Sequence, residues 1–148
     1  MENKNYHRTI TVNATAAEAM KKIKQVNLWW GKNFTGSSEK LNDKFTVRFS
    51  DTYFFDFQIS ELVPNKKVVW KVTDCNMPGY SDKTEWNNTK MVFELSEVKG
   101  KTKIDFTHVG LVKEMECYSD CEWGWNYYIS ESLPKLFKTG KGISSWTV

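Results

Sequence analysis

Few residues of this chain are suited to chemistry at an active site. Hydrolysis or group transfer needs a nucleophile beside a base, and only His7 and His108 offer an imidazole. Neither lies in a recognisable nucleophile motif, and the chain has no phosphate-cradling glycine loop or dinucleotide fingerprint. The residues therefore favour binding over catalysis, and an enzyme that uses Asp or Glu inside a pocket stays open as an alternative.

The cysteines form a second candidate group. Cys117 and Cys121 have C-x3-C spacing, and Cys121 falls in the first turn of an expected helix, where the helix dipole lowers a thiol pKa. A redox pair or a metal clamp would use this spacing. Zinc needs four ligands, however, and no second ligand pair lies nearby. We therefore predict ordinary reduced thiols, with no bound metal and no cofactor.

Three polar residues are predicted to face inward or to border the core. His108 is in phase with Ile104 and Phe106 on one strand, and Ser132 falls in the apolar stripe of the last helix. A buried hydroxyl or imidazole must have a hydrogen-bond partner, which is either a ligand or a backbone carbonyl. Arg8 would anchor an anionic ligand if it pointed inward, but reaching solvent or pairing with an acid is the favoured alternative.

Aromatic side chains are the unusual feature of the composition: nine Phe, seven Trp and six Tyr. They are either simply the core or the walls of a pocket of about 300–1,000 Å³ for a lipophilic molecule. On the pocket hypothesis, we predict these ligand-binding residues: Trp30, Phe57, Trp70, Phe93, Phe106, His108, Trp125, Ile129 and Ser132.

The N-terminal third should form a strand and two short helices. Residues 6–12 alternate as a strand does, and Thr15 with Glu18 makes a capping box for the helix that follows. The helical pattern breaks around Asn27, after which a turn or second short helix leads into a loop.

The middle of the chain predicts five further strands. Apolar residues alternate with polar ones around positions 45–49, 55–59, 68–72, 91–95 and 104–108. Short turns join most of these strands, which indicates an antiparallel sheet with one apolar face. The long loop at 74–86 holds Met77, Tyr80 and Trp86, and would serve as a lid or as a protein contact.

The last element is a long helix that should cover the sheet. We expect Ser119 and Glu122 to form its capping box, and Gly140 to end it. Its apolar side should carry Trp125, Ile129, Leu133 and Leu136, with Trp123 and Tyr127 nearer the outer side. Pro134 should bend the helix over the sheet.

Length, net charge and hydropathy limit the classes of protein to which the chain can belong. With 148 residues, the chain is the size of one domain, and we expect a single domain over residues 1–148. The net charge of +3 is spread over the sequence, which argues against nucleic-acid binding. No apolar run reaches membrane-spanning length, and no signal peptide is evident, so we expect a cytoplasmic protein.

The order of elements and several short motifs resemble a known family over nearly the whole chain. The motifs are Leu28-Trp29-Trp30, Glu61-Leu62-Val63-Pro64 with Val69-Trp70, Lys101-Thr102-Lys103-Ile104 leading to Thr107-His108-Val109-Gly110, and Gly124-Trp125 followed by Leu133, Leu136 and Gly140. Together they resemble the START-like, helix-grip (SRPBCC) superfamily. Within it, they resemble the family named after the C-terminal domain of the activator of the heat-shock-protein-90 ATPase. Asn42-Asp43-Lys44 stands where members often have a Gly-Gly pair, and Pro134 is also unusual.

The resemblance implies an α+β fold: a curved antiparallel sheet of about six strands around a long C-terminal helix, with two short helices after the first strand. It also implies a cavity between sheet and helix that binds a hydrophobic small molecule. A co-chaperone that contacts the ATPase is the alternative, although the eukaryotic activator has a separate N-terminal domain for which we expect no room here. A cyclase-like or hydratase-like enzyme using His108 is the third hypothesis. We expect a monomer or a weak homodimer.

Overall fold

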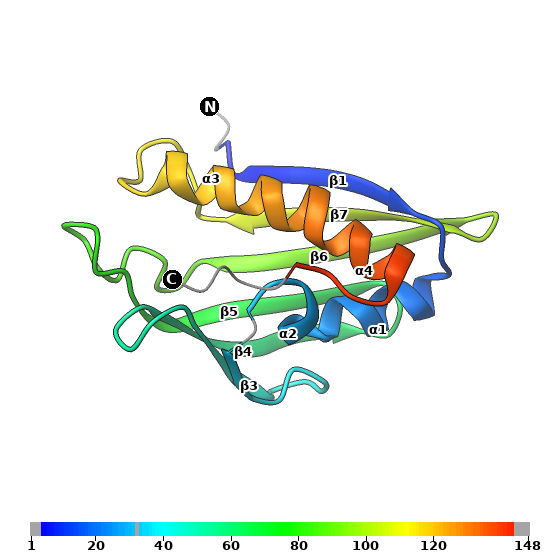
Figure 1. The fold of residues 1–148 in the computed structure, drawn as a ribbon, viewed down its shortest axis with the longest axis horizontal. Helices are drawn as coiled ribbons and strands as arrows, with labels where there is room; N and C mark the ends of the chain where they lie inside the picture. The colour runs from blue at the N-terminus through cyan, green and yellow to red at the C-terminus, as the bar shows by residue number, and fades with distance from the viewer. Residues whose placement is uncertain (1–3, 32, 144–148) are drawn as a thin grey trace.

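The computed structural model describes residues 4–31 and 33–143 of the chain (Figure 1). The elements run in the order β1 (Tyr6–Val12), α1 (Ala16–Lys24), α2 (Val26–Trp29), β2 (Asn33–Gly36), β3 (Lys44–Arg48), β4 (Phe54–Val63), β5 (Lys67–Asn76), β6 (Lys90–Val98), β7 (Lys101–Val109), α3 (Tyr118–Tyr127), the π-helical turn η1 (Tyr128–Ser132) and α4 (Leu133–Thr139).

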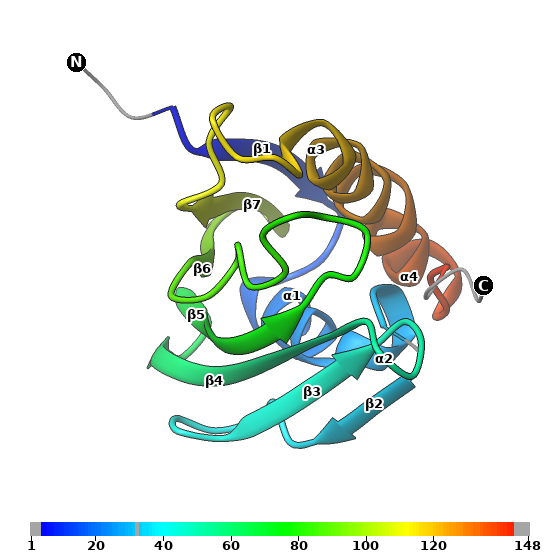
Figure 2. The same cartoon turned by 90° about the vertical axis from the view of Figure 1, so that its left-hand side faces the viewer.

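The strands form one antiparallel sheet in the order β1-β7-β6-β5-β4-β3-β2. The pairing of β4 with β5 shifts register at Asp56/Phe57 and again at Ile59/Glu61. Such bulges bend a strand and increase its twist. Seen end-on, the sheet curves around the helices (Figure 2).

The helices occupy the hollow of this curved sheet. Consecutive elements α3, η1 and α4 form one helical segment that runs beside β1, while α1 packs on β6 and β7 (Figures 1 and 2). The largest fully buried side chains between these layers include Trp29, Trp70, Trp125, Phe93 and Phe106. The aromatic face of the sheet is therefore covered by the C-terminal helical segment and by the two short helices.

This architecture confirms the predicted helix-grip fold, including the two short helices after β1. The sheet has seven strands where about six were expected. The added strand is β2, whose four residues pair with β3. It is too short for its alternation to stand out in the sequence.

The two predicted capping boxes have different outcomes. At α1, the Thr15 hydroxyl accepts a hydrogen bond from the Glu18 N–H at 3.2 Å, which confirms Thr15 as the N-cap residue. At α3, the Ser119 prediction is wrong, because the helix already begins at Tyr118 and its N-cap residue, Cys117, makes no side-chain cap. The carboxylate of Glu85 instead accepts the N–H groups of Glu116 and Cys117, at 2.7 and 3.1 Å.

The proline of the last helix follows a widened turn. The Leu133 N–H donates to the Tyr128 carbonyl five residues earlier, which is the hydrogen bond of a π-helix. Pro134 comes next, at the start of α4. Since Pro134 has no N–H to donate, the regular series of helical hydrogen bonds must be interrupted near this position in any case.

Candidate functional site

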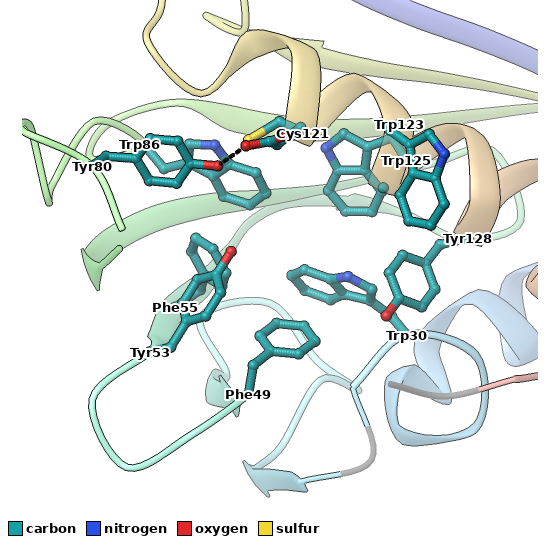
Figure 3. Close-up of a pocket in the computed structure, with 12 residues that line it drawn as sticks. Trp30, Phe49, Tyr53, Phe55, Tyr80, Trp86, Cys121, Trp123, Trp125 and Tyr128 are labelled. Carbon is teal, nitrogen blue, oxygen red and sulfur yellow. Dashed lines mark hydrogen bonds between the residues drawn. The ribbon is translucent and has the colours of Figure 1, made fainter. Parts of the chain in front are cut away.

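An aromatic pocket of about 420 Å³ opens at one end of the fold (Figure 3). Three parts of the chain enclose it: the β3–β4 hairpin, the loop between β5 and β6, and the first turns of the C-terminal helical segment, with the end of α2 as a fourth contact. The lining residues are Trp30, Phe49, Tyr53, Phe55, Tyr80, Trp86, Asp120, Cys121, Trp123, Gly124, Trp125 and Tyr128.

Trp30 lies at the inner end of the pocket, just after α2. The next residue, Gly31, packs so closely on β3 that an added Cβ would lie 2.1 Å from a methyl group of Val47. This close approach requires glycine and sets Trp30 against the sheet. The Trp30 ring lies 5.1 Å from the ring of Trp125 and 5.5 Å from that of Phe57, measured between centroids.

The β3–β4 hairpin supplies a second wall. Its turn is closed by a hydrogen bond from the Phe49 N–H to the Tyr53 carbonyl, at 2.8 Å. This turn brings the rings of Phe49 and Tyr53 to 5.4 Å from each other. Burial raises the pKa of the Tyr53 phenol, so the group stays neutral. Phe55, at the start of β4, packs directly against Trp86 of the β5–β6 loop, with ring centroids 4.2 Å apart.

The loop between β5 and β6 supplies a third wall, formed by Tyr80 and Trp86 (Figure 3). Two carboxylates anchor the loop to the segment before α3. Glu116 accepts hydrogen bonds from the N–H groups of Ser81 and Asp82, at 3.0 to 3.2 Å. Glu85, on the loop itself, accepts the two N–H groups that precede α3. Carboxylates from both the loop and the segment before α3 therefore hold this wall in place.

His108 is buried behind the pocket and holds two of its walls. Its Nδ1 accepts a hydrogen bond from the Trp125 indole N–H at 3.0 Å, which leaves Nε2 to donate to the Thr89 hydroxyl at 2.8 Å. Thr89 in turn donates to the Trp86 carbonyl at 2.7 Å. Burial lowers the pKa of His108 to about 3, so the ring is neutral. Both ring nitrogens are thus occupied by protein groups.

Asp120 is the charged residue of the pocket lining. It is exposed at the rim and accepts a hydrogen bond from the Tyr80 hydroxyl at 2.5 Å. Burial raises the pKa of Tyr80, and the hydrogen bond to the Asp120 carboxylate raises it further. Tyr80 is therefore a neutral donor to the Asp120 carboxylate, which lies beside the opening.

The two cysteines at the start of α3 are adjacent thiols. Their sulfur atoms lie 2.7 Å apart, with Cys121 as donor, and both are free. The hydrogen bond to Cys117, together with burial, raises the pKa of Cys121, which opposes thiolate formation. The residues that the structure describes hold no group of three His, Cys, Asp or Glu side chains suited to a metal ion.

The structure brings two of the nine predicted residues to the pocket, Trp30 and Trp125. The others are buried next to its walls or farther along the helix. Trp70 stacks on Trp30, Phe57 meets the Trp30 ring edge-on, and Phe106 packs against Trp125 with ring centroids 4.6 Å apart. Those away from the lining are Phe57, Trp70, Phe93, Phe106, His108, Ile129 and Ser132.

Ser132 and Arg8 have structural partners. The Ser132 hydroxyl donates to the Trp29 carbonyl at 2.6 Å and accepts from the Ile143 N–H at 2.8 Å, which ties the helix to α2 and to the C-terminal segment. Arg8 is exposed, and its Nε donates to the Ser130 hydroxyl at 2.8 Å. Neither residue lines the pocket.

Sequence reasoning missed most of the lining residues, although signals for some were present. Phe49 and Phe55 share their strands' apolar faces with predicted core residues. Tyr80 and Trp86 belong to the long loop that was expected to act as a lid or a protein contact. Trp123, expected on the outer side, is 59% exposed and borders the opening.

Comparisons with known proteins agree with this architecture. The family model described as activator of Hsp90 ATPase homolog 1-like protein matches residues 14–138. The solved structures that are similar include the Aha1 dimer from Colwellia psychrerythraea, at 25% identity and TM-score 0.76, with 94% of this chain and 99% of that one covered. SSP2350 from Staphylococcus saprophyticus has the same fold at 11% identity and TM-score 0.72, with 98% and 100% covered.

A third similar structure is DynU16, from the dynemicin biosynthetic locus. It is 15% identical with a TM-score of 0.70, and the match covers 95% of this chain and 49% of that one. No curated protein sequence matches the chain. None of the helices in the described residues has the length and apolar character needed to cross a membrane.

Proposed function

Because the chain belongs to the activator of Hsp90 ATPase homolog 1-like family, whose members share the helix-grip fold described above, we propose that it binds a hydrophobic small molecule in the aromatic pocket. The pocket itself carries this proposal. Its volume of about 420 Å³ lies in the range of small-molecule sites, and its walls are mostly rings. The three cysteines, all free thiols, suit the reducing cytoplasm that we propose as its compartment.

The states of the polar groups support binding rather than catalysis. General acid–base chemistry needs a group within reach of the ligand with a pKa near the working pH. His108 lies behind the wall with both nitrogens engaged, and burial keeps it neutral. The raised pKa of Cys121 makes it a poor nucleophile at neutral pH. These observations favour the binder over a cyclase-like or hydratase-like enzyme that uses His108.

Gly124 offers a direct test, since it lines the pocket and a Cβ added there meets no atom within 4 Å. Gly124→Leu should fill space at the pocket without disturbing the fold. Gly124→Ala is the matched control, because it changes the same helical position but adds one methyl group. Amide NMR spectra of both variants and the parent would be recorded against sterols, fatty acids, flavonoids, polyketide-like aromatics and hydrophobic amines.

Saturable shifts around Trp30, Trp86 and Trp125 in the parent and in Gly124→Ala, but not in Gly124→Leu, would support the proposal. Equal shifts in all three proteins would place the ligand elsewhere. A complete lack of response to the panel in the parent would refute the small-molecule proposal.

A co-chaperone role is the second candidate, and the family description is the observation that favours it. In this case the protein would contact a heat-shock-protein-90-type ATPase through its surface. Adding a chaperone middle domain to the labelled protein should then broaden or shift a set of surface amides. If only this sample changed the spectrum, the co-chaperone role would replace the small-molecule proposal.

A further inference from the structure

We propose that the pocket selects organic cations, in which a protonated or quaternary amine is attached to an aromatic or alkyl body. This inference rests on the proposed small-molecule binding and names the chemical class of the ligand. It follows from the charges around the pocket and from the aromatic rings that line it.

The lining carries a negative charge without a compensating cation. Asp120 is the one charged side chain among the described lining residues, which include no lysine or arginine. Tyr80 donates a single hydrogen bond to this carboxylate, which stays exposed at the rim. A ligand ammonium group near the rim would gain a charge-assisted contact with Asp120.

Two of the segments around the opening, the loop between β5 and β6 and the stretch that leads into α3, extend this negative region. Residues 77–89 and 110–124 contain six acidic side chains and two basic ones, whereas the whole chain has a net charge of +3. The acidic residues are Asp82, Glu85, Glu114, Glu116, Asp120 and Glu122, and the basic ones are Lys83 and Lys113. Acidic residues therefore concentrate at the pocket end of a chain that is basic as a whole.

The positive end of the α3 helix dipole offsets part of this negative potential. A helix N-terminus is equivalent to about half of a positive charge. The Glu85 carboxylate caps the N–H groups just before α3, and Asp120 lies in the first turn of the helix. The carboxylates of Glu85 and Asp120 together outweigh the partial positive charge at the N-terminus of α3. The electrostatic potential near the opening therefore favours a cation.

The walls also favour positive charge. Nine of the twelve lining residues are aromatic, and four of these are tryptophans. The face of an aromatic ring carries partial negative charge and attracts ammonium groups, most strongly in tryptophan. An anionic head group, such as a fatty-acid carboxylate, would gain no such attraction from the rings and would be repelled by the Asp120 carboxylate.

The test compares three ligands that share one body and differ in the charge of the head group: naphthylethylamine, naphthylethanol and naphthylacetate. Near neutral pH they are a cation, a neutral molecule and an anion. Calorimetric titration of the full chain should give the tightest binding for the amine, about 5- to 30-fold tighter than for the alcohol. Naphthylacetate should bind more weakly than the alcohol.

Asp120→Asn isolates the charge, because asparagine keeps an oxygen that can accept the Tyr80 hydrogen bond. This variant should lose several-fold in amine affinity relative to its affinity for the alcohol. Glu131→Gln, which removes an exposed carboxylate of η1 outside the pocket lining, is the matched control and should leave both affinities unchanged.

The outcomes separate this inference from the function on which it rests. Equal binding of all three ligands, or tightest binding of naphthylacetate, would overturn the cation selectivity and leave a small-molecule pocket in place. An unchanged preference for the amine in Asp120→Asn would also overturn it. Lack of binding by all three ligands would refute the small-molecule function for aryl ligands and the selectivity together.

Discussion

His108 illustrates how one residue can organise a pocket without entering it. Its two ring nitrogens link Trp125, on the helical segment, to Thr89, whose hydroxyl holds the Trp86 carbonyl. The imidazole thereby fixes two indole walls relative to one another. This arrangement needs a neutral ring with the proton on Nε2, and burial maintains that state.

The depressed pKa of His108 predicts that it makes stability depend on pH. The imidazole binds a proton with a pKa of about 3 in the folded protein and about 6.5 in the unfolded chain. Between these values the unfolded state binds more protons, so stability falls as the pH decreases from 6.5 towards 3. The His108 contribution should decline by up to about 1.4 kcal/mol per pH unit.

Urea unfolding of the parent and of His108→Gln at several pH values tests this prediction. The carboxylates titrate in both proteins, so the difference in unfolding free energy isolates the histidine. That difference should shrink as the pH falls below 6.5. A difference that stays constant down to pH 4 would contradict the assignment.

Ser132 should contribute to stability rather than to binding. Ser132→Ala leaves the Trp29 carbonyl without its hydroxyl donor and the Ile143 N–H without its acceptor, so we expect a loss of about 1–3 kcal/mol. Ser130→Ala, on the same helical turn, removes only the exposed contact with Arg8 and should cost less than about 0.5 kcal/mol. Thermal or urea unfolding measures both, and equal losses would argue against the prediction.

At the scale of elements, the pocket depends on how the loop between β5 and β6 is held. The loop carries two lining rings, Tyr80 and Trp86, and it is fastened to the segment before α3 by Glu85 and Glu116. The widened turn η1 begins at Tyr128, another lining residue. Irregular elements thus supply much of the wall, while the regular sheet supplies the layer of rings behind it.

Glu85→Ala should loosen this loop. The substitution removes the acceptor of the Glu116 and Cys117 N–H groups, so their amide hydrogen exchange should accelerate by about tenfold or more. Ligand affinity should fall because Tyr80 and Trp86 lose their fixed position. Glu114→Ala is the control, because it removes an exposed carboxylate from the segment before α3, near the Glu116 and Cys117 N–H groups. Identical amide exchange in the two variants would contradict the role of Glu85.

At the scale of the whole molecule, we expect weak self-association. Among residues 4–31 and 33–143, the exposed large hydrophobic side chains are spread over six different segments: Leu41, Val63, Val98, Val109, Trp123 and Ile143. An obligate homodimer normally buries a large and more continuous apolar surface.

Sedimentation velocity over a wide range of protein concentration tests this expectation. The average mass should approach that of the monomer on dilution and rise at high concentration. A dimer that persists at the lowest measurable concentration would show that the interface is strong and would contradict the prediction.

Apart from β2, the sequence alone was sufficient to predict the order of the elements and which of their residues face inward. Alternation and helical periodicity are local properties, which is why His108, Trp125 and Ser132 were correctly expected to be inward-facing. The resemblance added the helix-grip arrangement. What local patterns could not supply was the start of α3, because the N–H groups there are capped by Glu85 from a distant loop.

Only the tertiary structure decided where empty space lies. Periodicity tells which rings face inward, but a cavity depends on how rings from distant segments fill the same volume. Trp29 and Trp30 are neighbours in the chain, yet Trp29 is fully buried and donates to the Ile23 carbonyl, whereas Trp30 lines the pocket. The pocket therefore lies where the hairpin, the loop and the last helix meet, because packing fills the rest of the aromatic face.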